Sequence, residues 1–352
     1  MKILHIISWM AIGGAQRLLA DLLPIINHEV DVTLLVSKRV DNAFIQTIEN
    51  AGVKIISIEY DKIHSPLNII KVARYLKNYD VIHVHLFPSL YWVALANIFY
   101  GKPLVYTEHS TYNQRRTKWY WRGLEKWIYG RYEKIISISA LTQRNLMTWL
   151  QAKHNDKRFV VINNGINVKL FSTNEASHEY SKTLIMIGRF SPAKDQATII
   201  KAMALLKDDI HLILVGNGRG IEECKSLACQ LKVDNRVHFV GTQSDVSAWI
   251  AKADVGIQSS KWEGFGLAAV EMMAGGLPVV ATDVDGLREV VQGAGILFPV
   301  GNYQILADII NHLLADKRYY DDIKAKCLER SMQYDIHVMA DAYMNVYKKL
   351  SR

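Results

Sequence analysis

Residues 259–291, SSKWEGFGLAAVEMMAGGLPVVATDVDGLREVV, decide both the fold and the position of the site. The loop at 262–266 carries two glycines, and the apolar segment at 267–274 that follows has the composition of a buried helix. Glu271 stands inside that segment, where an isolated carboxylate is costly to bury. Either it pairs with a basic residue or lies at an edge, or it faces a cleft and binds a polar ligand across the helix start. Glu263, beside the glycine loop that starts the same helix, favours the second interpretation.

The bulk composition limits the class of protein. A chain of 352 residues is too long for one typical core, so we expect two domains. Half of the residues are hydrophobic and 22% are charged, which is typical of a soluble protein. The three cysteines form no C-x-x-C pair, so a reducing, cytosolic compartment is expected. The apolar start at 1–10 is interpreted as a buried strand and not a signal peptide, and the stretch at 86–100 is too short to span a bilayer.

Positive charge is concentrated in the first half of the chain. The net charge of +8 divides into +10 over residues 1–170 and −2 over 171–352, so the first half is expected to meet an anionic surface or substrate. The segment 114–132, QRRTKWYWRGLEKWIYGRY, mixes basic and aromatic residues as interfacial membrane helices do. The alternative to membrane contact is that the aromatic residues of this segment pack on the sheet. None of the usual nucleic-acid recognition signatures is present, so no nucleic-acid partner is expected.

Strands and helices alternate along the chain, which predicts an α/β fold with parallel, doubly wound sheets. In the first half, strands are expected at 2–8, 31–36, 53–58, 80–85, 103–107, 135–139 and 160–162, with a long helical segment at about 115–133. After a polar linker at 172–182 the pattern restarts, with strands expected at 183–187, 210–215, 237–240, 254–258 and 279–281. Two Rossmann-like domains, 1–170 and 171–335, are therefore predicted. A helical stretch is expected at 303–330, and the last helix, about 336–352, is expected to pack back on the first domain.

Ligands of open parallel sheets bind outside the carboxyl ends of the strands. Two such sheets facing one another would bring their loops to a shared central cleft. The loops in question carry Gly13 and Gly14, His109, Gly188 and Arg189, Gly216 and Gly218, and residues 263–267.

Three of these loops have a plausible chemistry and a plain alternative. Gly13 and Gly14 open a helix whose amides suit a phosphate, although a tight turn explains them as well. Arg189 and Lys194 can clamp a diphosphate from two sides, unless they belong to a solvated surface loop. His109 can hydrogen-bond a sugar hydroxyl or steady developing charge, or it is a structural histidine.

Two other classes of site are disfavoured. His83 and His85 share one face of a strand like a metal pair, but no third ligand or acidic cluster accompanies them, so no metal site is predicted. The dinucleotide fingerprint G-x-G-x-x-G is missing after the first strand. A nucleotide-dependent oxidoreductase therefore remains only as an alternative, as does a non-catalytic nucleotide-sugar-binding protein.

With these residues assembled, the chain resembles the retaining GT-B glycosyltransferases of family four, the group 1 glycosyltransferases. The resemblance extends over essentially the whole chain and is strongest over 160–291. It is carried by Asn164-Gly165-Ile166-Asn167, Gly188-Arg189 with Lys194-Asp195, Gly216-x-Gly218, Phe239-x-Gly241, Ala253-Asp254, and Glu263-Gly264-Phe265-Gly266-Leu267 with Glu271. Two departures, Gln16 and Ser110, stand where the family often has acidic residues, and both lie in the first domain.

The resemblance implies transfer of a hexose from a nucleotide diphosphate sugar, of UDP or GDP type, to a glycan or lipid-linked acceptor in cell-envelope polysaccharide synthesis. It implies that Arg189 and Lys194 hold the diphosphate, that Glu263 and the amides of Phe265, Gly266 and Leu267 hold the sugar, and that Glu271 holds the ribose. Gly13 and Gly14 would approach the phosphate or acceptor, and His109 would lie by the sugar.

The implied chemistry is a front-face substitution without metal or cofactor, in which the leaving diphosphate helps to deprotonate the acceptor. Glu263 and Glu271 are then not a glycosidase pair, because such a pair flanks one bond. Domain closure would exclude water. The expected location is the cytoplasm, with peripheral contact to the inner face of the membrane through 114–132.

Overall fold

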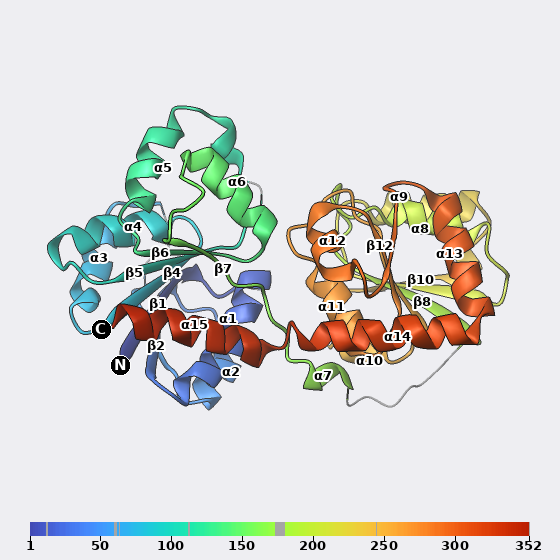
Figure 1. The fold of residues 1–352 in the computed structure, drawn as a ribbon, viewed down its shortest axis with the longest axis horizontal. Coiled ribbons are helices and arrows are strands. Elements are labelled where there is room, and N and C mark those ends of the chain that lie inside the picture. Colours follow the sequence, from blue (N-terminus) through green and yellow to red (C-terminus); the bar gives the residue numbers. More distant parts are fainter. Residues whose placement is uncertain are drawn as a thin grey trace. The chain divides into compact units, whose positions relative to one another are not determined.

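The computed structural model describes residues 1–11, 13–59, 62, 64–111, 113–172, 180–243 and 245–351. The chain divides into two compact units, Met1–Gly165 with Ile336–Arg352 and Ile166–Asp335 (Figure 1). The division falls between Gly165 and Ile166, whereas the sequence predicts a boundary after residue 170. Most of the predicted linker at 172–182 lies outside the described residues.

The first unit is built on a parallel sheet whose strands, within the described residues, follow the order β3-β2-β1-β4-β5-β6-β7. Its strands are β1 (Lys2–Trp9), β2 (Asp31–Lys38), β3 (Lys54–Ser57), β4 (Val81–His85), β5 (Leu104–Glu108), β6 (Lys134–Ser137) and β7 (Phe159–Val161). Most residues of β1, β2, β4 and β5 are buried, because helices cover both faces of a parallel sheet.

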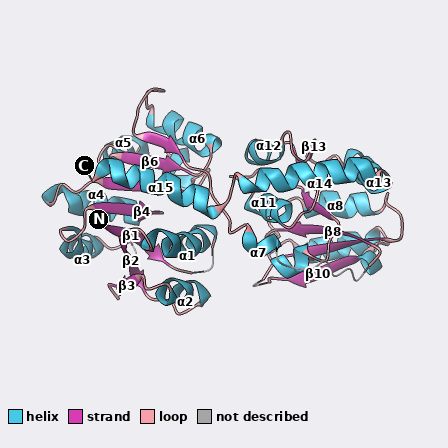
Figure 2. Cartoon of the chain, turned by 60° about the horizontal axis from the view of Figure 1, so that its bottom comes forward, coloured by secondary structure: helices cyan, strands magenta, loops and turns pink. Residues whose placement is uncertain are grey.

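Helices cover each face of this sheet (Figure 2). One face packs against α1 (Gly14–Asn27), α2 (Ala43–Asn50) and α15 (Ile336–Leu350). The other packs against α3 (Leu67–Leu76), α4 (Ser89–Ala96), α5 (Trp121–Tyr129) and α6 (Ala140–Leu150). The 3-10 turns η1 (Asn97–Phe99) and η2 (Gln114–Thr117) precede β5 and α5. The C-terminal helix thus contributes to the core of the first unit, with Tyr343 and Tyr347 both 0% exposed.

The second unit repeats the plan with the strand order β10-β9-β8-β11-β12-β13, all pairs parallel among the described residues. Its strands are β8 (Lys182–Ile187), β9 (Ile210–Val215), β10 (Val237–Gly241), β11 (Val255–Gln258), β12 (Val279–Thr282) and β13 (Ile296–Phe298). Its helices are α7 (Lys169–Ser172), α8 (Gln196–Met203), α9 (Ile221–Gln230), α10 (Ser247–Ile250), α11 (Leu267–Ala274), α12 (Asp285–Val291), α13 (Tyr303–Ala315) and α14 (Lys317–Met332), with the turn η3 (Asp234–Arg236).

Both units are therefore doubly wound α/β domains, and the predicted fold class is confirmed. Two predicted elements differ, and one element was missed. The segment 115–133 is not one helix, because Lys118 has extended backbone angles between η2 and α5. The stretch 303–330 consists of two helices, α13 and α14, that meet at Asp316. The short strand β13 was not predicted. No helix in the described part of the chain has the length and apolarity needed to cross a membrane.

Candidate active site

The sheet of the second unit has its switch point between β8 and β11, which lie side by side although the chain builds outward from each in opposite directions. Ligands of doubly wound sheets bind where the loops that follow such strands diverge. Here the two loops are joined by their backbones. The amide of Asp195 donates to the Ser259 carbonyl at 2.7 Å, and that of Lys261 donates to the Ala193 carbonyl at 2.9 Å. The loop that carries the predicted cations is therefore fixed against the loop that carries Glu263.

Lys194 is the link between these two loops. Its Nζ donates to the carboxylate of Glu263, and the side chains of both residues are 18% exposed. The side-chain amide of Gln258 is assigned with its oxygen and nitrogen exchanged, because both atoms then have hydrogen-bond partners. In this orientation the oxygen accepts from Lys194 Nζ at 2.8 Å, and the nitrogen donates to the Ile187 carbonyl at 3.3 Å. The stem of Lys194 lies over Gly188, where an added Cβ would be 3.5 Å from Lys194 Cγ. The cation is thus held in place by its neighbours, at the end of β8.

Gly216 and Gly218 allow the loop after β9 to lie directly on the loop after β8. Both have positive φ, at 136° and 156°, and a Cβ on either would lie 2.2 Å from the carbonyl oxygen of Gly188 or Phe190. The Phe190 amide also donates to the Asn217 carbonyl at 3.0 Å. The fold therefore requires glycine at both positions, so packing alone accounts for residues that the sequence marked as substrate-binding.

The loop at 263–266 rests on the start of α12. A Cβ on Gly286 would lie 2.4 Å from the Glu263 carbonyl oxygen, so only glycine lets α12 support the loop this closely. The Gly264 amide donates to Glu263 Oε1 at 3.1 Å, and Gly266, with φ of 94°, caps the start of α11. The ring of Phe265 is buried against Tyr334, so it anchors the loop in the core.

One stripe of α11 is partly exposed, and the other residues of the helix are buried. The stripe consists of Leu267, Ala268 and Glu271, which are three and four residues apart and so share one face. Side chains on a helix lean toward its N-terminus, so Glu271 leans toward the first turn of α11. Its carboxylate therefore lies on the same side as the loop of Glu263 and not in the apolar core.

Arg189 differs from Lys194 in its surroundings. It is exposed, and within the described residues its side chain makes no hydrogen bond or ion pair. The structure does not bring the two cations together as a preformed clamp. Arg189 is exposed after β8, and Lys194 is held by its neighbours in the same loop.

In the first unit, Gly13 and Gly14 form the start of α1. Gly13 has extended backbone (φ of −174°), and neither glycine has a positive φ. A Cβ on Gly14 would meet nothing within 4 Å, so neither the backbone nor the packing requires glycine there. Ile12, which precedes them, lies outside the described residues. A tight turn therefore does not explain Gly14.

His109 lies at the end of β5, where its Nε2 is 3.1 Å from Nδ1 of the buried His85. The sequence found no third histidine for His83 and His85, but the pairing of β1 with β4 places His5 opposite His83. Nitrogens of these three buried rings all lie within 4.8 Å of one another. They are engaged in hydrogen bonds to one another, to Tyr347 and to Thr107, at 2.5 to 3.4 Å. The rings are joined in a hydrogen-bonded network, and the three histidines also form a set that could hold a metal ion, so the lack of a third ligand no longer argues against a metal site.

Burial keeps these rings neutral. Loss of solvation lowers the pKa of His5 from 6.5 to about 3 and that of His109 to about 4. The same cause, with repulsion from the neighbouring imidazoles, holds the pKa values of His83 and His85 well below 6.5.

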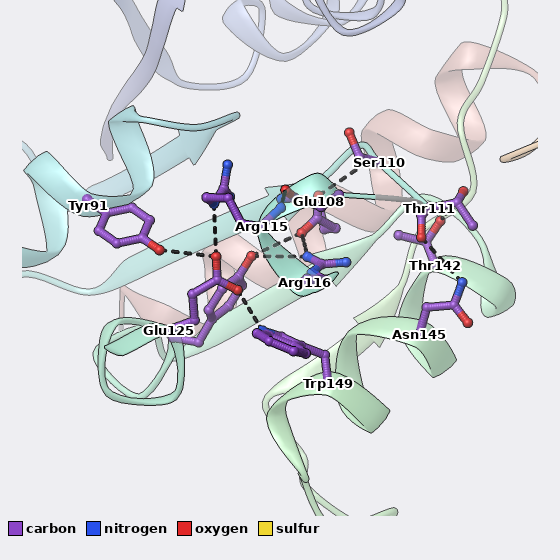
Figure 3. Close-up of polar contacts among 12 residues, drawn as sticks. Tyr91, Glu108, Ser110, Thr111, Arg115, Arg116, Glu125, Thr142, Asn145 and Trp149 are labelled. Atoms are coloured by element: carbon purple, nitrogen blue, oxygen red, sulfur yellow. Dashed lines mark hydrogen bonds and ion pairs between the residues drawn. The ribbon is translucent and has the colours of Figure 1, made fainter. Parts of the chain in front are cut away.

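Two buried carboxylates anchor the segment that follows His109 (Figure 3). Glu108 accepts from Arg116 Nη2 and from the Tyr129 hydroxyl at 3.0 Å. Glu125 accepts from Arg115 Nε at 3.0 Å, and its two other hydrogen bonds come from Trp149 Nε1 at 2.7 Å and the Tyr91 hydroxyl at 3.1 Å. Arg115 and Arg116, two of the four arginines in the predicted interfacial segment, thus point inward and hold η2 to the unit.

The rest of the segment 114–132 divides between core and surface. Tyr129 and Tyr132 are buried in the core, as the alternative interpretation of the aromatics requires. The exposed basic, aromatic and leucine side chains form what we call the α5 surface, consisting of Lys118, Trp119, Tyr120, Leu124, Lys126, Trp127 and Arg131. The segment therefore packs some of its aromatic residues in the core and leaves others exposed.

Comparison with known proteins identifies the family. Residues 169–329 match the family described as Glycosyl transferases group 1, and residues 12–170 match Glycosyltransferase Family 4. The phosphatidyl-myo-inositol mannosyltransferase of Mycobacterium leprae is 32% identical over 304 residues, which are 82% of this chain and 78% of that protein. The chain belongs to the group 1, family 4 glycosyltransferases. The enzyme of the same name from Mycolicibacterium smegmatis is 28% identical over 96% of this chain and 91% of its own.

Solved glycosyltransferases share the fold. HepE of Anabaena, in complex with UDP and glucose, superposes with a TM-score of 0.85 at 24% identity, covering 99% of each chain. The two parallel-sheet domains of this glycosyltransferase are therefore of the GT-B type, as the sequence predicts. Membership of the family disfavours the oxidoreductase that the sequence left as an alternative.

Several site residues were missed from the sequence. Gln258 ends the strand before the loop of Glu263 and accepts from Lys194, but a glutamine at a strand end carries no distinctive signal. Gly286 was visible only as the end of a loop. His5 could have been found, since β1 and β4 of a doubly wound sheet are neighbours and both carry histidines.

Proposed function

We propose that this glycosyltransferase retains the anomeric configuration and moves a hexose from a nucleotide diphosphate sugar of UDP or GDP type. The acceptor is a glycan or lipid-linked glycan of cell-envelope polysaccharide synthesis. The observation that carries the proposal is that the loops after β8 and β11 hold Lys194, Glu263 and the start of α11 together. The names of the mannosyltransferase relatives and the UDP and glucose bound by HepE support the classes of donor and acceptor.

The charges at these loops suit the parts of such a donor. Lys194 and the exposed Arg189 are the cations for the diphosphate, and the first turn of α11 adds the positive end of a helix dipole. Glu263 accepts hydrogen bonds from the sugar hydroxyls, beside the amides of Phe265, Gly266 and Leu267. Glu271, on the exposed stripe of α11, accepts from the ribose.

For the first unit, the proposed roles are that His109 binds a sugar and that the helix start at Gly13 and Gly14 binds a phosphate or the acceptor. Gly14 supports this role, because an added Cβ meets no protein atom within 4 Å. Close approach of a ligand is then the remaining reason for a bare backbone.

The reaction proceeds on one face of the sugar. The bond from the anomeric carbon to the diphosphate oxygen breaks, and the acceptor hydroxyl oxygen bonds to that carbon from the same side. The acceptor proton passes to the leaving diphosphate. Arg189, Lys194 and the amides of α11 stabilise the charge that develops on the leaving group, so catalysis rests on positioning and electrostatics. Since side chains supply the positive charge, no metal ion is required.

The donor site is tested by removing one cation and one carboxylate. Lys194→Ala and Glu271→Ala are compared with Lys326→Ala and Glu329→Ala, which change exposed residues of α14. Release of nucleoside diphosphate is measured with UDP- and GDP-sugars, envelope extract as acceptor, and chelator present. We expect losses on the order of 100-fold or more for the first pair and none for the second. Full turnover by either site variant refutes the assignment. An inverted anomeric signal in the product spectrum refutes retention.

We also propose that the enzyme is cytoplasmic and binds peripherally to the inner face of the membrane through the α5 surface. Trp119 and Trp127, 77% and 46% exposed, are aromatic residues of the kind that lie at the headgroup boundary, and Lys118 and Lys126 lie beside them in sequence. The double variant Trp119→Ala/Trp127→Ala should sediment less with anionic vesicles. The matched change of two exposed leucines in the second unit, Leu205→Ala/Leu328→Ala, should have no effect. Equal sedimentation of both variants contradicts the surface.

A further inference from the structure

A continuous chain of hydrogen bonds runs from His109 to the C-terminal helix through the buried core of the first unit. It begins with His109 Nε2 to His85 Nδ1 at 3.1 Å and His85 Nε2 to His5 Nδ1 at 3.0 Å. Tyr347 of α15 then joins His5 Nε2 at 3.4 Å to His83 Nδ1 at 2.5 Å. The chain ends with His83 Nε2 to Thr107 Oγ1 at 2.8 Å and Thr107 Oγ1 to the Tyr343 hydroxyl at 3.2 Å.

Each member of the chain constrains the next. A neutral imidazole has one N–H donor and one acceptor nitrogen, so a ring that accepts at one nitrogen must donate at the other. The rings of the chain are neutral because burial lowers the pKa of every one of them. If every inner hydroxyl also donates within the chain, the bonds can be made together in only two ways, with every donor pointing toward His109 or every donor pointing away from it. In a mixed arrangement Tyr347 or Thr107 accepts from both neighbours, and its own hydroxyl hydrogen then has no acceptor among the described residues.

The two directions are not equivalent at the far end. When the donors point toward His109, Tyr343 donates to Thr107 and every hydroxyl and N–H within the chain has an acceptor. When they point away, one of the two terminal hydroxyls, on Thr107 or Tyr343, has no acceptor among the described residues. Both residues are 0% exposed. A buried donor without a partner shifts such an equilibrium by roughly tenfold to a hundredfold, which favours the first direction.

We propose that this chain fixes the proton of His109 on Nδ1 and makes His109 a neutral hydrogen-bond donor to the substrate. In the favoured direction His85 Nδ1 donates to His109 Nε2, so the remaining proton of His109 is on Nδ1. That nitrogen has no hydrogen-bond partner within the described residues, and His109 is partly exposed. His109 therefore presents an N–H to an oxygen of the bound sugar or leaving group and is not a base.

Tyr347 is then a positioning residue for His109, although it lies on the last helix of the chain. Without the Tyr347 hydroxyl, His5 Nε2 has no partner in either hydrogen-bond direction of the three rings His5, His85 and His109. The free-energy difference between the two directions therefore falls. The tautomer of His109 with its proton on Nε2 then becomes populated. Tyr343→Phe removes an equally buried hydroxyl from the same helix, but at the end of the chain, where its loss leaves no donor of the favoured direction without an acceptor.

The test is the tautomeric state of His109, read from the ring-nitrogen shifts of 15N-histidine-labelled protein, with His109→Gln to assign the signals. In the wild type and in Tyr343→Phe we expect a protonated Nδ1 and an unprotonated Nε2 near neutral pH. In Tyr347→Phe we expect averaged or doubled signals. A wild type with its proton on Nε2, or with both nitrogens protonated, overturns the proposal, and this measurement requires only the assignment variant His109→Gln to fold. Identical spectra of the two tyrosine variants also overturn it.

A kinetic measurement connects the chain to catalysis, and this arm rests on the proposed function. Tyr347→Phe should lower kcat by roughly the fraction of molecules that hold the second tautomer, with the KM for the nucleotide sugar little changed. Tyr343→Phe should leave kcat unchanged. If the spectra behave as expected and kcat does not fall, the tautomer is fixed but His109 does not donate in the reaction. If the spectra fail, the chain itself is refuted, whatever the enzyme transfers.

Discussion

Mild acid should unfold the first unit, because three of its core histidines are kept neutral. His5, His83 and His85 are 0% exposed, and their pKa values lie well below 6.5, at about 3 for His5. Above pH 6.5 the rings are neutral in both the folded and the unfolded chain, so they do not affect stability. As the pH falls below 6.5, these histidines become protonated in the unfolded chain but stay neutral in the folded chain. Stability is then lost until the folded pKa is reached.

The size of the effect follows from the shifts. A histidine that stays neutral when folded loses about 2 kcal/mol of unfolding free energy between about pH 7.5 and about pH 5. Three such rings lose about 6 kcal/mol, and His109, whose pKa is about 4, adds to this loss. The sum is comparable to the whole stability of a typical domain, about 5–15 kcal/mol. We therefore expect the first unit to be marginal or unfolded near pH 5.

Urea unfolding at the two pH values measures this loss, with tryptophan fluorescence as the probe because six of the eight tryptophans lie in the first unit. His5→Gln should lose about a quarter to a third less free energy on acidification than the wild type. His28→Gln, which changes an exposed histidine, should lose as much as the wild type. A wild-type loss below about 1 kcal/mol would refute the reasoning, since it would mean that the buried rings accept protons without unfolding.

Two further predictions concern stability elsewhere. Gly218→Ala places a Cβ 2.2 Å from the Phe190 carbonyl oxygen at a φ of 156°, so the melting temperature of the second unit should fall sharply. The Cβ added by Gly14→Ala meets nothing within 4 Å, so the melting temperature should stay unchanged. The same variant should weaken donor or acceptor binding in titration calorimetry. Glu125→Gln removes a buried charge that accepts three hydrogen bonds and should cost about 3–5 kcal/mol in chemical denaturation. The exposed Glu133→Gln should cost less than about 0.5 kcal/mol, and equal losses in both would contradict a structural role for the Glu125 network.

The strands were predictable because both faces of a parallel sheet are buried, and continuous apolar runs such as 210–215 therefore stand out from the sequence. The helix predicted at 115–133 failed for a specific reason. Its basic residues look like one amphipathic surface, but Arg115 and Arg116 bond to Glu125 and Glu108, and the chain must extend at Lys118 to allow it. Only the folded unit shows which carboxylates lie within reach.

The candidate site was predictable as a set of loops but not as a set of contacts. The glycine loop around Glu263 and the cations after β8 are local signals, and the rule for strand ends brings them to the same edge. That Lys194 bonds to Glu263, 69 positions away, depends on β8 and β11 being neighbours. The same holds for His5 and His83, whose meeting depends on the pairing of β1 with β4.

The return of the chain to the first unit has a consequence for synthesis on the ribosome. The helix α15 supplies Tyr343 and Tyr347 to the first core, yet it is made last, so that core stays incomplete until almost the whole chain has emerged. The second unit is a continuous insertion whose two ends are held side by side by a bridge between Ile166 and Asp335. Once folded, it closes the long loop between Gly165 and α15, which lowers the entropy lost when α15 docks. A substitution that slows folding of the second unit should therefore delay completion of the first, although it touches none of the first unit's residues.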